Sequence, residues 1–228
     1  MSQYVLGMEA KLAEDILPSA MSASACKQVI DFPADLKGKK ILDIGSGESE
    51  CVAWLCSQGA YAVGVDVRYD KPGDLEKDTE KSKAEIRHIL ISCYGKHMGE
   101  VHYTELDDKI EIARKNFREH RESSPECYKQ SLAGALPFPD GHFDMAFSIN
   151  CITHGLDQDY RVLCQAVYEA FRTLKKGGEL QLYPFFWGDD QEILKNHKYL
   201  HGIHKNNSLV EDVPNTTNKR LRIRKPKL

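Results

Sequence analysis

The stretch ILDIGSGES, at residues 41–49, decides the fold. An apolar run with one acid inside it, Asp43, ends in two glycines, Gly45 and Gly47. A continuous apolar run of this length predicts a strand that is buried on both faces. Glycines directly after such a strand let the backbone turn sharply and let a ligand approach main-chain N–H groups. The stretch therefore predicts a strand, a tight ligand-binding turn and a following helix.

The rest of the chain repeats this alternation of strand and helix. The predicted strands are 39–44, 60–67, 127–132, 143–149 and 179–183, and the predicted helices are 50–59 and 160–174. Spacing of this kind indicates parallel βαβ units, and hence an α/β fold with a doubly wound, mostly parallel sheet. The segments 208–213 and 219–225, joined by the turn-rich PNTTN, predict a C-terminal antiparallel hairpin.

The segment 69–126 is about twice as long as a plain crossover needs, and it is highly charged. Its pattern predicts two helices, 75–98 and 106–121. Two interpretations stay open for this insertion: a lid over the mouth of an active site, or a solvated helical excursion. We expect one domain over residues 1–228, with an N-terminal helical segment at 1–35.

Composition argues against a partner that is bound by charge alone. The 228 residues carry a formal net charge of -3, so no global basic field attracts nucleic acid or anionic lipid. Basic residues do crowd the segment 219–227. Basic side chains on an exposed edge strand commonly oppose aggregation, and this interpretation is preferred to phosphate binding.

Seven cysteines without a paired framework predict reduced thiols and an intracellular, cytoplasmic protein. The N-terminus carries acids and no apolar core of a signal peptide, and no apolar run approaches a membrane span of about 18 residues. Cys51 and Cys56 have no matching cysteine or histidine pair nearby in the sequence. Lysines surround His197, His201 and His204, which share one helical face. The sequence therefore predicts no metal site.

Acidic side chains around the glycines narrow the choice of ligand. Glu48 and Glu50 stand at the predicted helix start, where they would repel the diphosphate of a nicotinamide cofactor. Asp43, at the strand end, can hold an ammonium group, directly or through water. Asp66 ends the second strand, where an acid can accept two ribose hydroxyl hydrogens. A ligand with one sugar, one ammonium group and no phosphate matches S-adenosylmethionine.

Taken together, the motifs resemble those of class I S-adenosylmethionine-dependent methyltransferases, in particular members that act on small molecules. ILDIGSGES resembles the first motif of that family and AVGVDVR (62–68) the second. SLAGALPFPDGHFDMAFSINCITHGL (131–156) resembles the third and fourth, and LKKGGELQLY (174–183) the fifth. The likeness covers roughly residues 36–185 and implies a Rossmann-like methyltransferase fold. It also implies S-adenosylmethionine as cofactor and S-adenosylhomocysteine as product.

The resemblance assigns cofactor contacts residue by residue. It places Asp43, Gly45, Ser46 and Gly47 in the loop on the methionine side, Asp66 on the ribose, Val67 on the adenine and Asn150 at the methyl-donor end. The family usually has an acid before the LPF stretch, to accept from the adenine amino group. This chain has Ser131, Leu132 and Ala133 there, so the Ser131 hydroxyl or a backbone carbonyl is expected to replace the acid.

His154, four residues past Asn150, matches a histidine that small-molecule members often carry after the fourth strand. It is the expected general base or acceptor-binding residue, and the alternative is a histidine that only caps the loop. By elimination the expected acceptor is a small molecule. A nucleic-acid or protein acceptor is not favoured but stays open, as does a methyltransferase-like binding protein without turnover. A nicotinamide-dependent oxidoreductase is the weakest alternative. The oligomeric state is not predicted.

Overall fold

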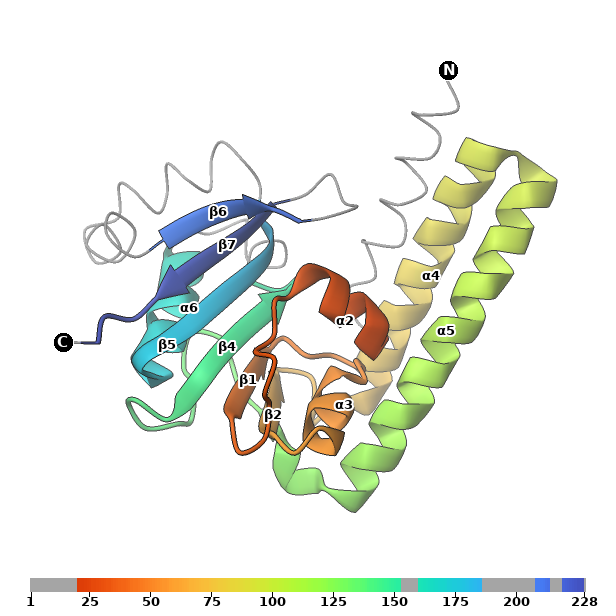
Figure 1. Ribbon diagram of the computed structural model, residues 1–228. Helices are drawn as coiled ribbons and strands as arrows, with labels where there is room; N and C mark the ends of the chain where they lie inside the picture. The colour runs from red at the N-terminus through yellow and green to blue at the C-terminus, as the bar shows by residue number, and fades with distance from the viewer. Residues whose placement is uncertain (1–19, 153–159, 186–207, 214–218, 228) are drawn as a thin grey trace.

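The computed structural model describes residues 20–152, 160–185, 208–213 and 219–227, and within them seven strands form one sheet (Figure 1). The strand order is β3-β2-β1-β4-β5-β7-β6. The first five strands in this order are parallel, and β7 is antiparallel to both of its neighbours. The predicted fold class, a doubly wound and mostly parallel sheet with a C-terminal antiparallel hairpin, is confirmed.

The strands lie close to their predicted positions. They are β1 Lys40–Ile44, β2 Tyr61–Asp66, β3 Tyr128–Gln130, β4 Phe143–Ile149, β5 Leu174–Phe185, β6 Ser208–Asp212 and β7 Lys219–Arg224. The described helices are α2 Ala23–Val29, α3 Cys51–Ser57, α4 Pro72–Tyr94, α5 Lys96–Ser123 and α6 Tyr160–Thr173, with one 3₁₀ turn, η1 Pro125–Cys127. β5 is longer than predicted, because it begins before the Lys-Lys-Gly-Gly stretch and continues after an irregularity there.

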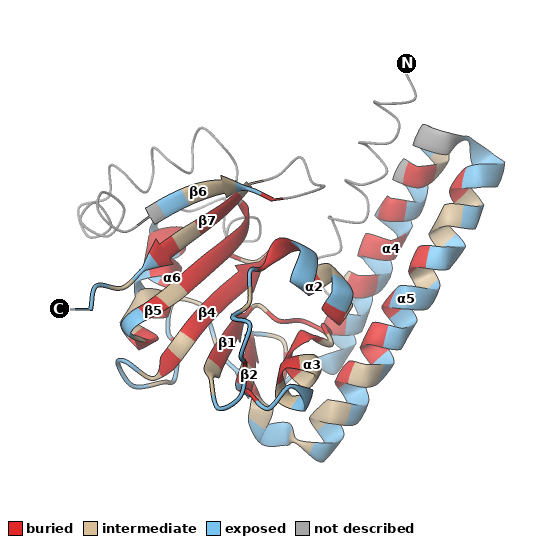
Figure 2. Cartoon of the chain, in the orientation of Figure 1, coloured by how far each residue is buried: buried red, intermediate tan, exposed pale blue. Residues whose placement is uncertain are grey.

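The sheet is buried on both faces, which explains its continuous apolar strands (Figure 2). Successive side chains of a strand point to opposite faces. Ile41 therefore packs in a core with the helices α2 to α5, and its neighbour Leu42 packs in a second core with α6. Both side chains are fully buried.

The strand order reverses between β1 and β4, which lie side by side but connect to opposite halves of the sheet. Ligands of doubly wound sheets bind beyond the carboxyl ends of the strands at such a point. The glycine turn follows β1 there, and Asn150 follows β4. The topology and the sequence therefore indicate the same ligand site, at the glycine turn and Asn150.

The insertion forms two antiparallel helices, α4 and α5, that run alongside each other (Figure 1). The predicted boundary between them is wrong, because α4 ends at Tyr94 and α5 already begins at Lys96. Gly95, at φ 77°, makes the turn, whereas Gly99 lies inside α5. Lys83 on α4 reaches Glu111 on α5 at 2.8 Å. No helix in the described part of the chain is long and apolar enough to cross a membrane.

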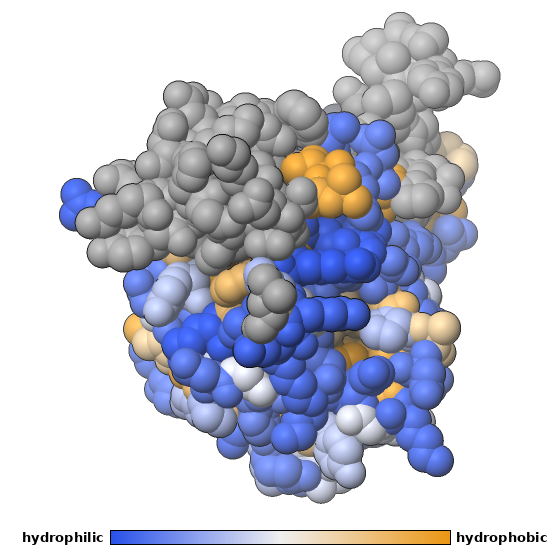
Figure 3. All heavy atoms as spheres, turned by 60° about the vertical axis from the view of Figure 1, so that its left-hand side comes forward, coloured by the Kyte–Doolittle hydropathy of each residue, from blue (hydrophilic) through white to orange (hydrophobic). Residues whose placement is uncertain are grey.

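The basic residues of the segment 219–227 lie on β7 and just after it. Acids of neighbouring segments pair with the four on β7, and Lys225 donates to backbone carbonyls. Arg220 pairs with Glu211 on β6, and Arg222 Nε lies 3.3 Å from Glu179 Oε1 on β5. Figure 3 turns this side of the molecule toward the viewer, and its described surface is mostly hydrophilic. These pairings favour the interpretation of the cluster as a charged sheet edge over a phosphate-binding surface.

Candidate functional site

The glycine turn after β1 is held tightly by its neighbours. Gly45 and Gly47 have positive φ angles of 74° and 51°, which glycine adopts without strain. The N–H groups of Gly45 and Ser46 both donate to the carbonyl of Val65, at 2.8 and 3.1 Å. A Cβ added to Gly45 would lie 2.2 Å from Cys151 Cβ. We expected the missing side chain of Gly45 to make room for a ligand. In the structure its space is taken by Cys151 after β4, so a larger residue at position 45 would clash with that cysteine.

Asp43 is fully buried at the end of β1. Its burial, and then the negative charge of Asp66, raise the pKa of its carboxyl well above the usual range. A carboxyl in this condition gains a strong interaction if a cation arrives, since the cation favours its ionised form. This property fits the predicted ammonium contact.

Asp66 is buried and accepts hydrogen bonds from two neighbouring residues. The Gly47 N–H donates to Oδ2 at 3.2 Å, and the Arg68 N–H donates to Oδ1 at 2.9 Å. The Arg68 guanidinium adds a two-pronged contact, with Nε 3.0 Å from Oδ1 and Nη2 3.1 Å from Oδ2. A carboxylate offers about four lone-pair sites, so four donors saturate it. Ribose hydroxyls can bind Asp66 in the predicted way only after the Arg68 side chain leaves.

Tyr69 fixes the glycine turn from the start of the insertion. Its hydroxyl donates to the Gly47 carbonyl at 3.1 Å and is hydrogen-bonded to the Ser46 hydroxyl. Its buried ring stacks on Phe117 of α5, with centroids 6.0 Å apart. Sequence reasoning missed both Arg68 and Tyr69, although they stand two and three residues after the acid of the second motif.

Glu48 and Glu50 differ in how their charges are met: Glu48 pairs with Arg114, whereas the hydrogen bonds to Glu50 come from the neutral Ala23 N–H and Asn116 amide, so only the Glu48 part of the predicted repulsion of a diphosphate is weakened. Glu48 is buried, and its Oε2 lies 3.0 Å from Arg114 Nε and 2.9 Å from the Thr79 hydroxyl. Glu50 accepts the Ala23 N–H at 2.6 Å. Both carboxylates serve to attach the insertion and the N-terminal helix to the turn.

Apolar side chains lie exposed where β2 and β3 end. Val67 is 47% and Leu132 is 62% exposed, which is unusual for such residues beside a buried sheet. The Ser131 N–H donates to the Asp66 carbonyl at 3.3 Å, so the two strand ends are adjacent. The Ser131 hydroxyl lies 2.9 Å from the Ala135 carbonyl. Ala133 is partly buried against the α6 core.

Asn150 ends β4 in the left-handed conformation, with φ 56°, and its side chain is buried. Its N–H donates to the Tyr183 carbonyl on β5 at 2.8 Å. A non-glycine residue in this conformation is uncommon and typical of constrained sites. The structure brings Asn150 to the same sheet edge as Asp43, whereas His154 lies outside the described residues, as do His197, His201 and His204.

Comparison with known families matches residues 87–182 to the family described as "Methyltransferase domain". The match therefore covers β3, β4 and most of β5 but not the glycine turn or Asp66.

Curated relatives include the ubiquinone/menaquinone biosynthesis C-methyltransferase UbiE of Shewanella oneidensis, 31% identical over 129 residues. That alignment covers 53% of this chain and 46% of the relative. UbiE of Shewanella sediminis is 33% identical over 116 residues, which is 49% of this chain and 41% of the relative. The chain thus aligns with less than half the length of these relatives.

A chain in the solved complex between the Haloferax volcanii Trm112 methyltransferase activator and a candidate methyltransferase has a similar fold, with a TM-score of 0.51. It is 12% identical, and the likeness covers 90% of this chain and 89% of that one. At this identity the likeness concerns the fold alone.

Proposed function

We propose that this chain is a class I S-adenosylmethionine-dependent methyltransferase and that it transfers the methyl group of S-adenosylmethionine to a small-molecule acceptor. The match of residues 87–182 to a methyltransferase domain and the similar fold support this proposal. The observation that carries the proposal is the meeting of Asp43, Gly47, Asp66 and Asn150 at the point where the strand order reverses. The partial match to the UbiE C-methyltransferases supports the reaction class.

The cofactor would lie across the carboxyl ends of β1, β2 and β4. The ammonium group of its methionine part would approach Asp43, and its ribose would take over the oxygens of Asp66. Adenine would cover the exposed side chains of Val67 and Leu132, which removes apolar surface from water.

Methyl transfer needs little chemical help from the protein, because the positive sulfonium already activates the methyl group. A nucleophile must be held in line with the carbon–sulfur bond, and such positioning contributes up to about 7–11 kcal/mol. A base is needed only where the acceptor carries a proton, and His154 is the residue proposed for it. Asn150 would line the methyl-donor end.

The α4–α5 hairpin would form one wall of the cofactor pocket and a lid over its acceptor side. Its helices are braced against each other, and Arg114 joins α5 to the glycine turn through Glu48. Because α4 and α5 are joined in this way, the hairpin would move as a unit about its base, and its tip at Gly95 would follow. We also place the protein in the cytoplasm, where its thiols stay reduced.

Calorimetry with S-adenosylhomocysteine and NAD tests cofactor choice, and a methyl-transfer screen over metabolites and RNA then tests turnover and acceptor. We expect S-adenosylhomocysteine to bind and NAD not to bind. Asp66→Ala should weaken binding by about 1.5–3 kcal/mol, the scale of hydrogen bonds to a charged group. Asp70→Ala, at an exposed acid four residues later, is the matched control. Tighter binding of NAD would favour an oxidoreductase, and binding without transfer would favour a non-catalytic protein.

A further inference from the structure

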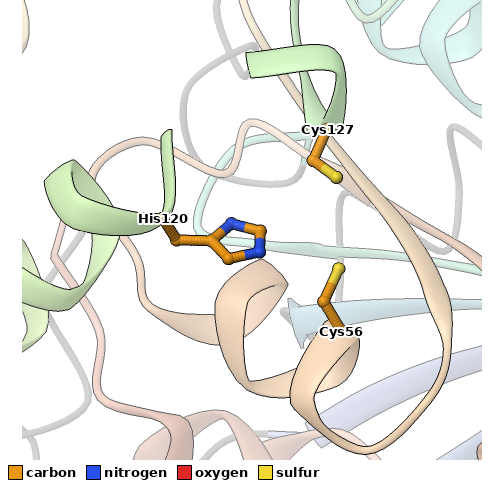
Figure 4. Close-up of side chains that lie close together, drawn as sticks. All are labelled: Cys56, His120 and Cys127. Atoms are coloured by element: carbon orange, nitrogen blue, oxygen red, sulfur yellow. The ribbon is translucent and has the colours of Figure 1, made fainter. Parts of the chain in front are cut away.

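A second cluster of reactive side chains lies away from the proposed cofactor site. Cys56 lies near the end of α3, His120 near the end of α5, and Cys127 at the end of η1. One ligand atom from each of the three lies within 4.8 Å of the other two. Figure 4 shows the imidazole and both thiols pointing toward a common centre. Two sulfurs and one nitrogen therefore come together from α3 and from the adjacent elements α5 and η1, which follow α3 much later in the sequence.

The histidine is already oriented for binding a ligand. Its Nδ1 atom lies 2.9 Å from the Tyr128 hydroxyl. With Nδ1–H donating to this oxygen, Nε2 keeps its lone pair for a metal, and metal-binding histidines are usually held by such a partner. Tyr128 itself is buried and packs edge-on against His120, with ring centroids 5.6 Å apart. The ring is thus held in place by a neighbour that is itself fixed.

We propose that Cys56, His120 and Cys127 bind a zinc ion. Two thiolates and one imidazole form a ligand set that zinc accepts, with a fourth position left for water or another ligand. Bond lengths of about 2.3 Å to sulfur and 2.0–2.1 Å to nitrogen place tetrahedral ligand atoms about 3.6–3.8 Å apart. The ligand atoms are separated by up to 4.8 Å, and side-chain movements of about 1 Å would shorten these separations to the tetrahedral value.

The position of the cluster indicates a structural role for the ion. The helix α3 begins beside the glycine turn, and Cys56 lies near its other end. The cluster is therefore separated from the turn by the length of α3. A metal there would tie the base of the α4–α5 hairpin and the start of β3 to the end of α3. All three ligands are partly exposed, so an ion can enter from solvent. The site would fix the base about which the hairpin moves and would not take part in methyl transfer.

Metal binding by the full chain tests this proposal directly. The reduced, chelator-treated protein is titrated with zinc, and bound metal is measured after dialysis. Cobalt serves as a spectroscopic substitute, because thiolate ligation gives a charge-transfer band. We expect one equivalent of zinc, and Cys56→Ala, Cys127→Ala and His120→Gln should each lower the affinity at least about tenfold. Tyr128→Phe should lower it about 10–100-fold without removing a ligand.

Two control variants separate this site from other thiols and imidazoles. Cys164→Ala changes a buried cysteine in the core on the other face of the sheet, and His97→Gln changes an exposed histidine at the start of α5. Both should bind zinc like the unchanged chain. Less than half an equivalent bound by the unchanged chain would overturn the proposal. So would equal affinity in the double variant Cys56→Ala/Cys127→Ala, or a disulfide between these two cysteines that forms in the presence of zinc.

Discussion

Replacing Arg114 by methionine removes the cation that faces buried Glu48, and the cost can be worked out from the contacts. The two side chains are 3% and 5% exposed and approach to 3.0 Å. Removing one partner of a buried ion pair costs about 3–5 kcal/mol, because the other charge stays buried. Two contacts of Glu48 remain, the Thr79 hydroxyl at 2.9 Å and Arg118 at 3.5 Å. We therefore expect the low end of the range, about 3 kcal/mol.

For a chain of this size, a loss of about 3 kcal/mol lowers the melting temperature by about 6–12 °C. Urea denaturation followed by circular dichroism measures the loss, and calorimetry with S-adenosylhomocysteine measures its effect on the site. Cofactor affinity should also fall, since Glu48 directly follows Gly47. Glu48→Gln keeps an acceptor for Thr79 and removes the charge, so the double variant Glu48→Gln/Arg114→Met should recover at least half of the stability.

Arg87→Met is the matched control on the same hairpin. Arg87 also contacts a glutamate, Glu100, at 2.7 Å, but this pair is exposed and should contribute little. If Arg114→Met is no less stable than Arg87→Met, the buried pair does not anchor the hairpin. If the double variant is as unstable as the single one, the unpaired carboxylate is not the cause of the loss.

Three further predictions concern the cofactor site. The pKa of Asp43 is raised in the folded chain, so the fold favours the protonated carboxyl. Asp43 therefore contributes to stability at pH values below the usual pKa of aspartate, and this contribution is lost as the pH rises through the raised pKa. Asp43→Asn should therefore flatten this pH dependence in urea denaturation and weaken S-adenosylhomocysteine binding, whereas an unchanged pH profile would contradict it. Arg68→Gln should tighten S-adenosylhomocysteine binding about tenfold in calorimetry, because it frees Asp66, and weaker binding would show that Arg68 holds the ligand. Cofactor and acceptor should slow hydrogen exchange at 95–99 and 123–125, whereas equal exchange with and without them would favour a solvated excursion.

The sheet could be predicted closely because its strands carry a strong local signal. Phe143–Ile149 is apolar and bounded by a Pro-Asp-Gly turn, and the observed β4 has the same limits. The helix boundary in the insertion could not be predicted, since two glycines lie four residues apart. A Cβ on Gly99 would lie 2.6 Å from Ile91 Cα, so this glycine serves the close packing of α5 on α4. Only the tertiary contact distinguishes it from Gly95.

The charged residues of the site could be predicted from the sequence, but the ion pairs that they form could not. Glu48 and Arg114 are both visible in the sequence, yet 66 positions separate them. The sequence therefore indicates an acid beside the glycine turn without showing that a distant arginine neutralises it. The proposed zinc ligands escape sequence analysis for a similar reason, because metal motifs are recognised by short spacings and Cys56 is far in the sequence from His120 and Cys127.

The contacts of Asp43 and Asp66 indicate what a cofactor bound in the proposed way would replace. Their two carboxyl groups interact unfavourably, and the Arg68 guanidinium supplies the nearby positive charge in the ligand-free chain. Arg68 also contacts Asp78 on α4, so its side chain has a second acid available when it leaves Asp66. In the proposed site, S-adenosylmethionine would bring its own positive charges and hydroxyl donors to the same place. In the proposed binding mode one cation would be exchanged for another at a fixed acidic pair, and the displaced arginine would keep its contact with Asp78 on α4.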